Sequence, residues 1–439
     1  MDKKETSTFQ LIFMGIFGAI IFIGFIALLT TNGGSGRVGP SSVATILIWG
    51  TYPGETIDRL KAAMLEQDKN AALNFNYVEK RPETFATELA EALSQQTGPD
   101  VILIPQDMML RQKSKIYQIP FGQNTITAGA YYGTFLNAAQ VFLDHTGAWA
   151  LPFAIDPLIA YWNRQHFTNE GLVVFPATWD NFDIAVQKLT KKDANLTLLR
   201  NGVGMGTWDN VNNAKNIINT LFLQQGTKLV VLNRDNYFEV ISGVNDAVIN
   251  NTLSYYTNFA NPTKPEYSWN RTMGNDLQYF TSGRSSIYFG LASELPNVSQ
   301  TNPNLNFFVA TVPQQRDAEI KSTFANVYGF ALMKLSPNLS DSFRQITVLT
   351  SAEAVKILTG LSNLPPIRRD VAQDAPDQNY MEIFYQSAVI SDTWPDPDNI
   401  ATDAAYKSAI DQILLTNNPA GAMRYLLDNF SALLNSLSK

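Results

Sequence analysis

The sequence predicts an α/β fold for a body that begins near Val43, and three observations support this prediction. Apolar runs of strand length alternate with amphipathic helical segments over residues 44–104, an order typical of a parallel sheet with crossover helices. Hydrophobic residues make up 45% of the chain and charged residues only 16%, which allows sizeable cores. The length of 439 residues indicates two or three domains.

The first elements of this body follow one another without long connections. A strand over Ala44–Trp49 precedes a helix over Thr56–Gln67, whose apolar residues recur on one face. A second strand over Leu73–Val78, a second helix over Glu83–Gln95 and a third strand over Val101–Ile104 complete the unit. Sheets of this kind bind ligands at the carboxyl ends of their strands.

Two polar residues stand at such strand ends. Tyr52 follows the first predicted strand, and Asp107 follows the third. An aromatic ring can pack on an apolar ligand face, and a carboxylate makes strong hydrogen bonds to hydroxyl or amine groups. We therefore expect both residues at a ligand-binding edge.

The central stretch of the chain combines a break with two regular elements. Pro157 biases Asp156 away from the helical region, and the apolar run Leu158–Trp162 that follows has strand length. A helix then begins after Thr178, a favourable N-cap residue. Asp156 is therefore expected at a break just before a strand, and we treat it as a second candidate carboxylate beside Asp107.

Beyond this stretch, residues 179–326 are expected to be mostly helical with polar loops. The Gly-rich loop Gly202–Asn213 carries Trp208. Its glycine spacing is neither G-x-G-x-x-G nor that of a P-loop, and Lys215 is not placed as a P-loop lysine, so nucleotide binding is not indicated. Trp269 and Trp394 lie in other polar loops. These three tryptophans are the candidates for stacking on a ligand.

The last third of the chain returns to strands and then closes with helices. A strand is expected to begin at Val327, with Tyr328 as a further ligand-binding candidate. Two helices over Ala401–Leu415 and Ala420–Leu437 follow the extended loop around Trp394.

The amino terminus carries a membrane signal. Leu11–Leu29 is apolar and uncharged over 19 residues, close to the roughly 20 needed to span a bilayer. No A-x-A-like cleavage site follows, which favours an uncleaved anchor over a cleaved signal peptide, although the second alternative stays open. Lys3 and Lys4 precede the span, which predicts residues 1–10 in the cytoplasm and the body outside. The Gly/Ser-rich residues 30–42 are expected to be a flexible linker.

The amino-acid composition offers few or no residues for several classes of functional site. The chain has no Cys and only two His, and its formal net charge is −7. Disulfides and thiolate sites are therefore excluded, no metal site or cofactor is expected, and no nucleic-acid footprint is visible.

A family resemblance is carried by ordered strings of residues. The central stretch contains Leu151-Pro152, Asp156, Ala160–Arg164 and Pro176–Phe182 in that order. Further strings are the opening strand ending in Trp49, Gly98-Pro99-Asp100, Phe280–Gly290 and Leu364–Asp370. This order resembles the family 1 extracytoplasmic solute-binding proteins of ABC importers, and the similarity covers most of the body.

The resemblance implies a two-lobed periplasmic-binding-protein fold of type II, the maltose-binding-protein kind, to which the apolar run Leu11–Leu29 adds an expected N-terminal transmembrane helix. Lobe 1 would comprise residues 43–155 and 329–385, and lobe 2 residues 156–328 and 386–439. Crossovers are expected near Ala154–Leu158, near Val327–Phe330 and before Trp394. The implied function is capture of a sugar or oligosaccharide in the inter-lobe cleft and its delivery to an ABC permease in the same membrane. The resemblance implies no catalysis, and we expect a monomer.

The resemblance also assigns roles to individual residues. Asp107 and Asp156 match ligand-binding carboxylates of the family, and Trp208 matches an aromatic that faces the ligand. After Gly290 the family usually continues with Gly-x-Trp, whereas this chain has Ser293 and Glu294 as polar substitutes. Glu294 could equally be the acidic residue of a helix start.

Two other functions stay open on the sequence alone. Asp107 and Asp156 could form the paired carboxylates of a glycoside hydrolase, if their separation suits one. The same closure of two lobes could also serve an anchored sensor that passes ligand occupancy to a membrane partner.

Overall fold

The computed structural model describes most of the body of the chain. The described residues are 44–69, 72–123, 125–195, 197–241, 246–373, 375–376 and 380–437. The predicted cytoplasmic segment 1–10, the membrane anchor 11–29 and the linker 30–42 lie outside them. Within the described part, no helix is both long and apolar enough to cross a membrane.

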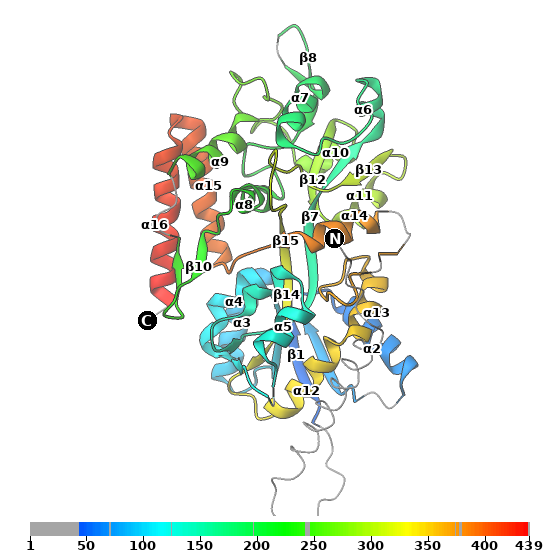
Figure 1. Cartoon of the computed structure of the whole chain (residues 1–439), viewed down its shortest axis with the longest axis vertical. Coiled ribbons are helices and arrows are strands. Elements are labelled where there is room, and N and C mark those ends of the chain that lie inside the picture. Colours follow the sequence, from blue (N-terminus) through cyan, green and yellow to red (C-terminus); the bar gives the residue numbers. More distant parts are fainter. Residues whose placement is uncertain are drawn as a thin grey trace, which may run out of the picture.

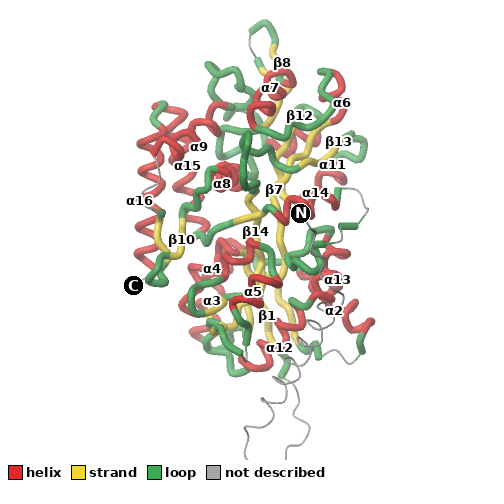
Figure 2. The backbone as a smooth tube through the Cα atoms, in the orientation of Figure 1, coloured by secondary structure: helices red, strands yellow, loops and turns green. Residues whose placement is uncertain are grey.

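One mixed sheet extends from one end of the molecule to the other (Figures 1 and 2). Eleven strands of the described chain belong to it, and eight of them form a continuous path. The order along that path is β2 (Phe75–Glu79), β1 (Ile46–Gly50), β3 (Val101–Pro105), β14 (Thr323–Met333), β7 (Leu151–Asn163), β12 (Ser285–Leu291), β9 (Leu198–Val203) and β8 (Lys191–Lys192).

Shorter strands complete the sheet or stand apart from it. Off the main path, β13 (Phe307–Ala310) pairs with β7, and β4 (Ile116–Tyr117) and β15 (Ser391–Asp392) pair with β14. Two small two-stranded sheets are formed by β5 (Ile119–Pro120) with β6 (Gly147–Ala148) and by β10 (Val230–Leu232) with β11 (Phe238–Val240).

The lower part of the molecule in Figure 1 contains the predicted β-α-β-α-β unit. Strands β2, β1 and β3 run parallel, with Ile46 opposite Phe75 and Ile48 opposite Val101. This confirms the parallel sheet that the alternating pattern predicted. The helices of this part are α2 (Gly54–Gln67), α3 (Pro82–Ser94), α4 (Gln106–Gln112), α5 (Ala128–Thr134), α12 (Leu339–Leu349) and α13 (Ala352–Ser362), with the 3₁₀ helices η1 (Lys113–Lys115) and η2 (Asn137–Phe142).

The upper part surrounds the other end of the sheet. Its helices are α6 (Arg164–Asn169), α7 (Trp179–Leu189), α8 (Ala214–Gln224), α9 (Asp246–Asn258), α10 (Asp276–Thr281), α11 (Leu295–Thr301), α14 (Met381–Val389), α15 (Asn399–Thr416) and α16 (Pro419–Leu437), with the 3₁₀ helix η3 (Ala292–Glu294). The expectation that residues 179–326 are mostly helical is wrong, because strands β8 to β13 also lie there. These strands are short, and β12 is buried on both faces, so they lack the alternation that marks a half-exposed strand.

Among the strands of the described residues, β7 and β14 run through both parts of the molecule, and they pair antiparallel. The apolar residues from Leu151 to Ile155 of β7 belong to one hydrophobic cluster, and those from Leu158 to Trp162 belong to two others. The clusters also change between Phe324 and Ala325 of β14. We call lobe 1 the part around the first cluster and lobe 2 the part around the other two. The exact chain boundaries of the lobes stay a prediction.

The pairing of β7 with β14 requires a glycine at position 329. The register shifts between Tyr328 and Gly329, and a Cβ atom on Gly329 would lie 2.8 Å from the Phe142 ring and 2.9 Å from the Ala150 Cβ. Both neighbours are fully buried or nearly so. A side chain at this position therefore has no space without moving the packed core.

We expect Gly329→Ala to lower the free energy of unfolding by about 1–3 kcal/mol through overpacking. The matched control is Gly360→Ala in α13, where a Cβ would meet nothing within 4 Å and helix propensity should add about 0.5–1 kcal/mol. Urea unfolding of both variants measures the difference. Equal stability of the two variants would contradict the packing argument.

Candidate functional site

The junction of the two lobes gathers several of the predicted ligand-binding residues. Asp156 lies on β7 opposite Asn326 of β14, and only 5% of its surface is exposed. Its Oδ1 accepts a hydrogen bond of 2.9 Å from the backbone N–H of Ser293 on η3. Burial raises the pKa of Asp156 to about 7, against the lowering effect of its hydrogen bonds to Ser293. Asp156 therefore links β7 to lobe 2.

Two tyrosines of lobe 1 lie beside this carboxyl group. The rings of Tyr52 and Tyr328 meet edge to face, with 5.1 Å between centroids, and Tyr52 also packs edge-on against Phe153. Burial, and then the charge of Asp156, raise the pKa of both hydroxyls far above their usual value. Both tyrosines therefore stay protonated and can donate hydrogen bonds.

Asp107 brings a second carboxyl group to the junction. It lies in the first turn of α4, directly after β3, and within the described structure its buried Oδ1 has no hydrogen-bond partner. Burial raises its pKa to about 7, while the charge of Lys215 acts in the opposite direction. A buried acceptor without a partner is costly, and a ligand hydroxyl could satisfy it.

Lys215 places a cation of lobe 2 near Asp107. Its Nζ lies 2.7 Å from Asp396 Oδ2 and 2.6 Å from Asp403 Oδ1, and it donates to Thr402 Oγ1 at 2.9 Å. These carboxylates outweigh the cost of burial and raise the pKa of Lys215. Lys215 therefore stays charged at the junction, on the side opposite to α4.

Glu294 caps the start of the 3₁₀ helix η3. One of its oxygens accepts hydrogen bonds from the backbone N–H of Leu291 at 3.2 Å and from Asn213 Nδ2 at 2.9 Å, and the other accepts from the Tyr288 hydroxyl. Of the two alternatives that the sequence left open, the structure shows this one. Burial raises the pKa of Glu294.

The three candidate tryptophans occupy different environments. Trp208 is half-buried and stacks on Tyr406, with 5.7 Å between centroids and 8° between planes. Trp269 is fully buried, and its Nε1 donates to Asn210 Oδ1. Trp394 is 3% exposed and packs against Phe324. Trp269 and Trp394 are therefore packed against other side chains in this structure, and their stacking on a ligand stays a prediction.

The structure thus brings Tyr52, Asp107, Asp156 and Tyr328 together, with the Ser293 backbone completing the contact to lobe 2. The junction also contains residues that sequence reasoning missed, namely Gln106, Asn213, Lys215, Asn326 and Asp396. Gln106 Oε1 accepts from the Val327 N–H at 2.7 Å, and its Nε2 donates to Asn326 Oδ1 at 3.3 Å. The sequence signal that could have identified Gln106 is its place beside Asp107 at the end of a predicted strand.

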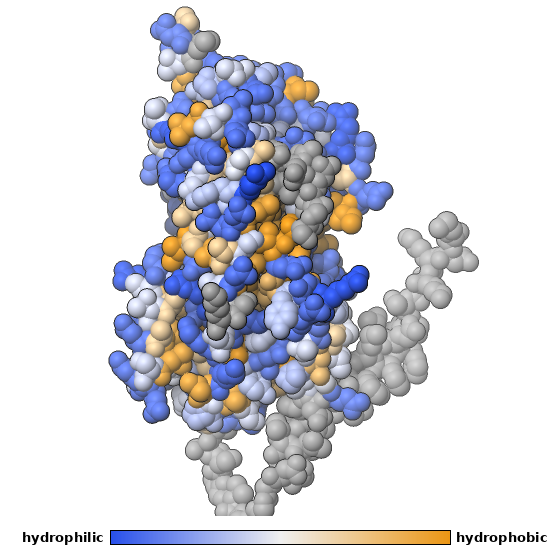
Figure 3. All heavy atoms as spheres, turned by 90° about the vertical axis from the view of Figure 1, so that its left-hand side faces the viewer, coloured by the Kyte–Doolittle hydropathy of each residue, from blue (hydrophilic) through white to orange (hydrophobic). Residues whose placement is uncertain are grey.

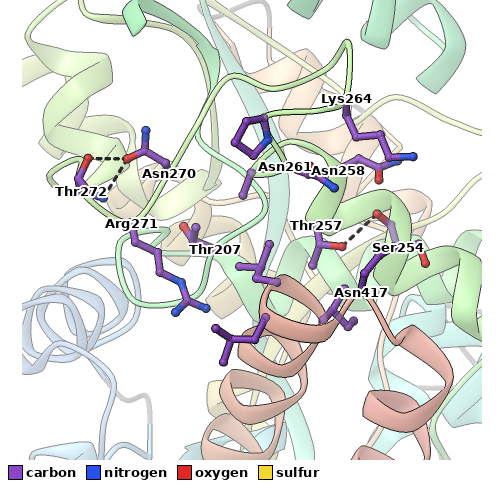
Figure 4. A pocket seen from close by; sticks show the side chains of 15 residues that line it. Thr207, Ser254, Thr257, Asn258, Asn261, Lys264, Asn270, Arg271, Thr272 and Asn417 are labelled. Carbon is purple, nitrogen blue, oxygen red and sulfur yellow. Dashed lines mark hydrogen bonds between the residues drawn. The ribbon is translucent and has the colours of Figure 1, made fainter. Parts of the chain in front are cut away.

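A separate cavity of about 520 Å³ lies within lobe 2, between the carboxyl ends of α9 and α15 (Figure 4). Its wall combines hydroxyl and amide side chains with the apolar Ile413, Leu414 and Leu415. None of the residues that line this cavity is a predicted site residue, although one of them, Thr207, is the sequence neighbour of the candidate Trp208. The groups at the lobe junction do not belong to this cavity.

Among the described residues, no group of three or more His, Asp or Glu side chains is placed to hold a metal ion. The groups gathered at the junction are carboxylates, tyrosine hydroxyls and amides, which offer hydrogen bonds. Figure 3 also shows apolar side chains at the level where the lobes meet, on the side of α15 and α16.

Residues 62–384 match the family model described as bacterial extracellular solute-binding protein. The chain belongs to this family. A comparison of the sequence with curated proteins gave no match.

Solved structures of similar fold support the two-lobed architecture of this solute-binding protein. A cyclo/maltodextrin-binding protein complexed with maltotetraose is 16% identical, with a TM-score of 0.69, and the match covers 91% of this chain and 98% of the other. The cyclic α-maltosyl-1,6-maltose-binding protein of Arthrobacter globiformis is 15% identical, with a TM-score of 0.67 and coverage of 90% and 100%. The GacH receptor of Streptomyces glaucescens, determined unliganded and with acarbose, is 16% identical, with a TM-score of 0.66 and coverage of 89% and 98%.

Lobe 2 contains a buried carboxyl group with a raised pKa, that of Asp276. Asp276 is 2% exposed. Its Oδ1 accepts from the backbone N–H groups of Asn212 and Leu277, and its buried Oδ2 has no partner in the described structure. Burial raises its pKa from 3.8 to about 7. The folded state therefore holds a proton that the unfolded chain releases near pH 4.

The stabilisation from Asp276 should be complete below about pH 4 and lost as the pH rises through about 7. We expect the free energy of unfolding to fall less in Asp276→Asn than in the parent between about pH 5 and pH 8. At pH 8 the variant's free energy of unfolding should exceed that of the parent by about 1–3 kcal/mol. Urea unfolding across this range is the measurement. The control is Asp58→Asn at an exposed position of α2, and an unchanged pH slope in Asp276→Asn would refute the assignment.

Proposed function

We propose that this protein captures a sugar or oligosaccharide between its two lobes and delivers it to an ABC importer. The observation that carries the proposal is the set of hydrogen-bonding groups at the lobe junction, centred on the hinge-strand carboxyl group of Asp156. Family membership supports solute binding. Three proteins of similar fold are described with sugar-like ligands, namely maltotetraose, a cyclic maltose derivative and acarbose.

The chemistry of the junction suits a neutral, hydroxyl-rich ligand. Asp107 and Asp156 accept hydrogen bonds from ligand hydroxyls, and the protonated Tyr52 and Tyr328 donate to ligand oxygens. Lys215 adds a positive charge on the lobe 2 side, while its three N–H bonds are directed at Asp396, Thr402 and Asp403. Because these groups come from both lobes, a ligand that contacts them favours the closed arrangement, which is the usual switch of hinge-type binding proteins.

The proposal extends to the position of the protein in the cell. The family is described as extracellular, which supports a body outside the cytoplasm. We propose residues 11–29 as a single-pass anchor with the amino terminus inside, and residues 30–42 as a linker. A flexible linker of about 13 residues has a reach near 20 Å. Such a linker would keep the body close to a permease in the same membrane and raise its effective concentration there.

We propose binding without catalysis. Asp156 is held by the Ser293 backbone, and the reactions of a glycosidase need two carboxyl groups aimed at one glycosidic bond. The proposed lobes are 43–155 with 329–385 and 156–328 with 386–439. Three residues of α14, Met381, Phe384 and Tyr385, pack with lobe 2, so the boundary near 385 is the first to test by limited proteolysis.

Maltotetraose is the first ligand to test. At 100 times its dissociation constant it should stabilise the purified full-length chain by about 2.7 kcal/mol, measured as a thermal shift. Asp156→Asn keeps the acceptor for Ser293 but removes the charge, and we expect it and Asp107→Asn to weaken binding roughly 10- to 100-fold. Isothermal titration calorimetry would measure this change.

The matched control is Asp276→Asn, a buried carboxyl group of lobe 2 that lies behind the junction, which should leave affinity unchanged. Absence of a thermal shift with maltotetraose and with other saccharides would contradict a sugar ligand. Release of shorter products on long incubation would show an enzyme instead of a binder.

A further inference from the structure

A further cavity of lobe 2 lies where β7 ends and β13 pairs with it. Its volume is about 550 Å³, and it is bounded by Trp162 at the end of β7, by α6, by residues 171–175 and by β13. The labels α6 and β13 mark its place in the upper part of Figure 1. None of its lining residues is among the ligand-binding candidates of the lobe junction. We call it the β13 cavity.

The walls of the β13 cavity are mostly apolar. The Trp162 indole is 8% exposed, and its ring centroid lies 5.4 Å from that of Phe308 and 6.3 Å from that of Phe175. Val173 and Val174 also line the cavity, although they are 87% and 73% exposed. Covering such side chains removes apolar surface from water, which is favourable. A ligand with an apolar group would therefore gain free energy here.

One cation stands among these apolar walls. Arg164 is the charged residue among those that line the cavity, and none of the lining residues is acidic. Its guanidinium carbon lies 5.0 Å from the ring centroid of Phe308. The nearest carboxylate in the sequence, that of Glu170, is paired with Lys191 and Arg200 instead. Within the described part of the chain Arg164 has no ion-pair partner, so its N–H groups are available to an anion.

A second donor of the β13 cavity lacks an acceptor. Trp162 Nε1 is buried and has no hydrogen-bond partner in the described structure. The indole N–H groups of Trp149, Trp179 and Trp269 all donate to side-chain oxygens. An indole N–H only donates, and a buried donor without an acceptor is costly. A ligand acceptor that reaches Trp162 Nε1 would remove this cost.

We propose that the β13 cavity binds a small organic acid in which a carboxylate is joined to an aryl or branched alkyl group. The planar guanidinium of Arg164 matches a carboxylate with two parallel hydrogen bonds, and the apolar walls take the rest of the molecule. A cavity of this size suits a small ligand. A hydroxyl-rich ligand fits poorly, because Thr168 is the one hydroxyl side chain among the lining residues. This site goes beyond the proposed function and does not depend on it.

Phenylbutyrate is the probe, and saturation-transfer NMR on the purified full-length chain measures its binding. For a ligand of this size we expect a dissociation constant on the order of 1 mM. Phenylbutanamide keeps the ring without the charge, and butyrate keeps the charge without the ring. Both should bind about tenfold more weakly than phenylbutyrate. Equal binding of phenylbutyrate and phenylbutanamide would overturn the proposal.

Arg164→Gln removes the cation at an exposed position, so the fold should be kept. Phenylbutyrate affinity should fall about tenfold or more, and Arg164→Lys should lose less, because it keeps the charge but not the planar fork. The matched control is Arg284→Gln. Arg284 is also an exposed arginine of lobe 2 beside a ring, 4.1 Å from the Tyr279 centroid, but it does not line the cavity. Its loss should leave the affinity unchanged.

The indole N–H signals report where the probe binds. The chain has seven Trp, and in protein with isotope-labelled tryptophan the signal that Trp162→Phe lacks belongs to Trp162. We expect phenylbutyrate to shift this signal more than the other indole signals. If Trp162→Phe does not fold, the comparison of Arg164→Gln with Arg284→Gln still decides the proposal. Equal affinity of these two variants would overturn it.

Maltotetraose separates this site from the lobe junction. We expect phenylbutyrate to bind equally well with and without the saccharide, because no lining residue of the β13 cavity belongs to the junction. Displacement of phenylbutyrate by maltotetraose would place the probe at the junction and overturn the proposal. A chain that binds phenylbutyrate but no saccharide would keep this site and contradict only the proposed sugar ligand.

Discussion

The antiparallel pairing of β7 with β14 is the constraint on which the rest of the structure depends. These two strands run through both lobes, and every residue of β7 is buried. Two of its residues are prolines, with Pro152 opposite Gly329 and Pro157 opposite Ala325. Proline has no N–H to donate, and Pro157 lies where the strand passes from one hydrophobic cluster to the next. The lobes are therefore joined by one continuous sheet that carries a proline at their junction.

Asp156 lies in that same segment, and its position couples the hinge to lobe 2. A carboxyl group buried there loses hydration, which raises its pKa to about 7. The Ser293 N–H offsets part of the cost. Asp107 is in a similar position on the lobe 1 side, with a buried oxygen that has no partner in the described structure. Sites that bind polar ligands commonly carry such costs in the empty protein, because the ligand supplies the missing hydrogen bonds.

The positions of Tyr52 and Asp107 at strand ends could be predicted from the sequence, whereas the exposure of the tryptophan rings could not. Tyr52 and Asp107 follow apolar runs whose alternation with helices fixes the edge of the sheet, and the Asp-Pro break located Asp156. Trp269 and Trp394 were chosen only because they stand in polar loops, and loop polarity does not determine which way an indole ring points. Lys215 was set aside because it fits no phosphate loop, although its role depends on Asp396 and Asp403, which lie far along the chain. Contacts of such sequence separation leave no local pattern.

The two lobes meet at Asp156, because its strand belongs to one lobe and its hydrogen-bond donor to the other. The first half of β7 packs in lobe 1, whereas the Ser293 N–H that donates to Asp156 comes from lobe 2. Under the proposed function, a ligand that bonds to Asp107 and Asp156 adds contacts to the arrangement in which the two lobes meet. A difference of about 1.4 kcal/mol in such contacts changes the population ratio of two arrangements about tenfold. The residues that select the ligand would then also set how far its binding shifts the lobes.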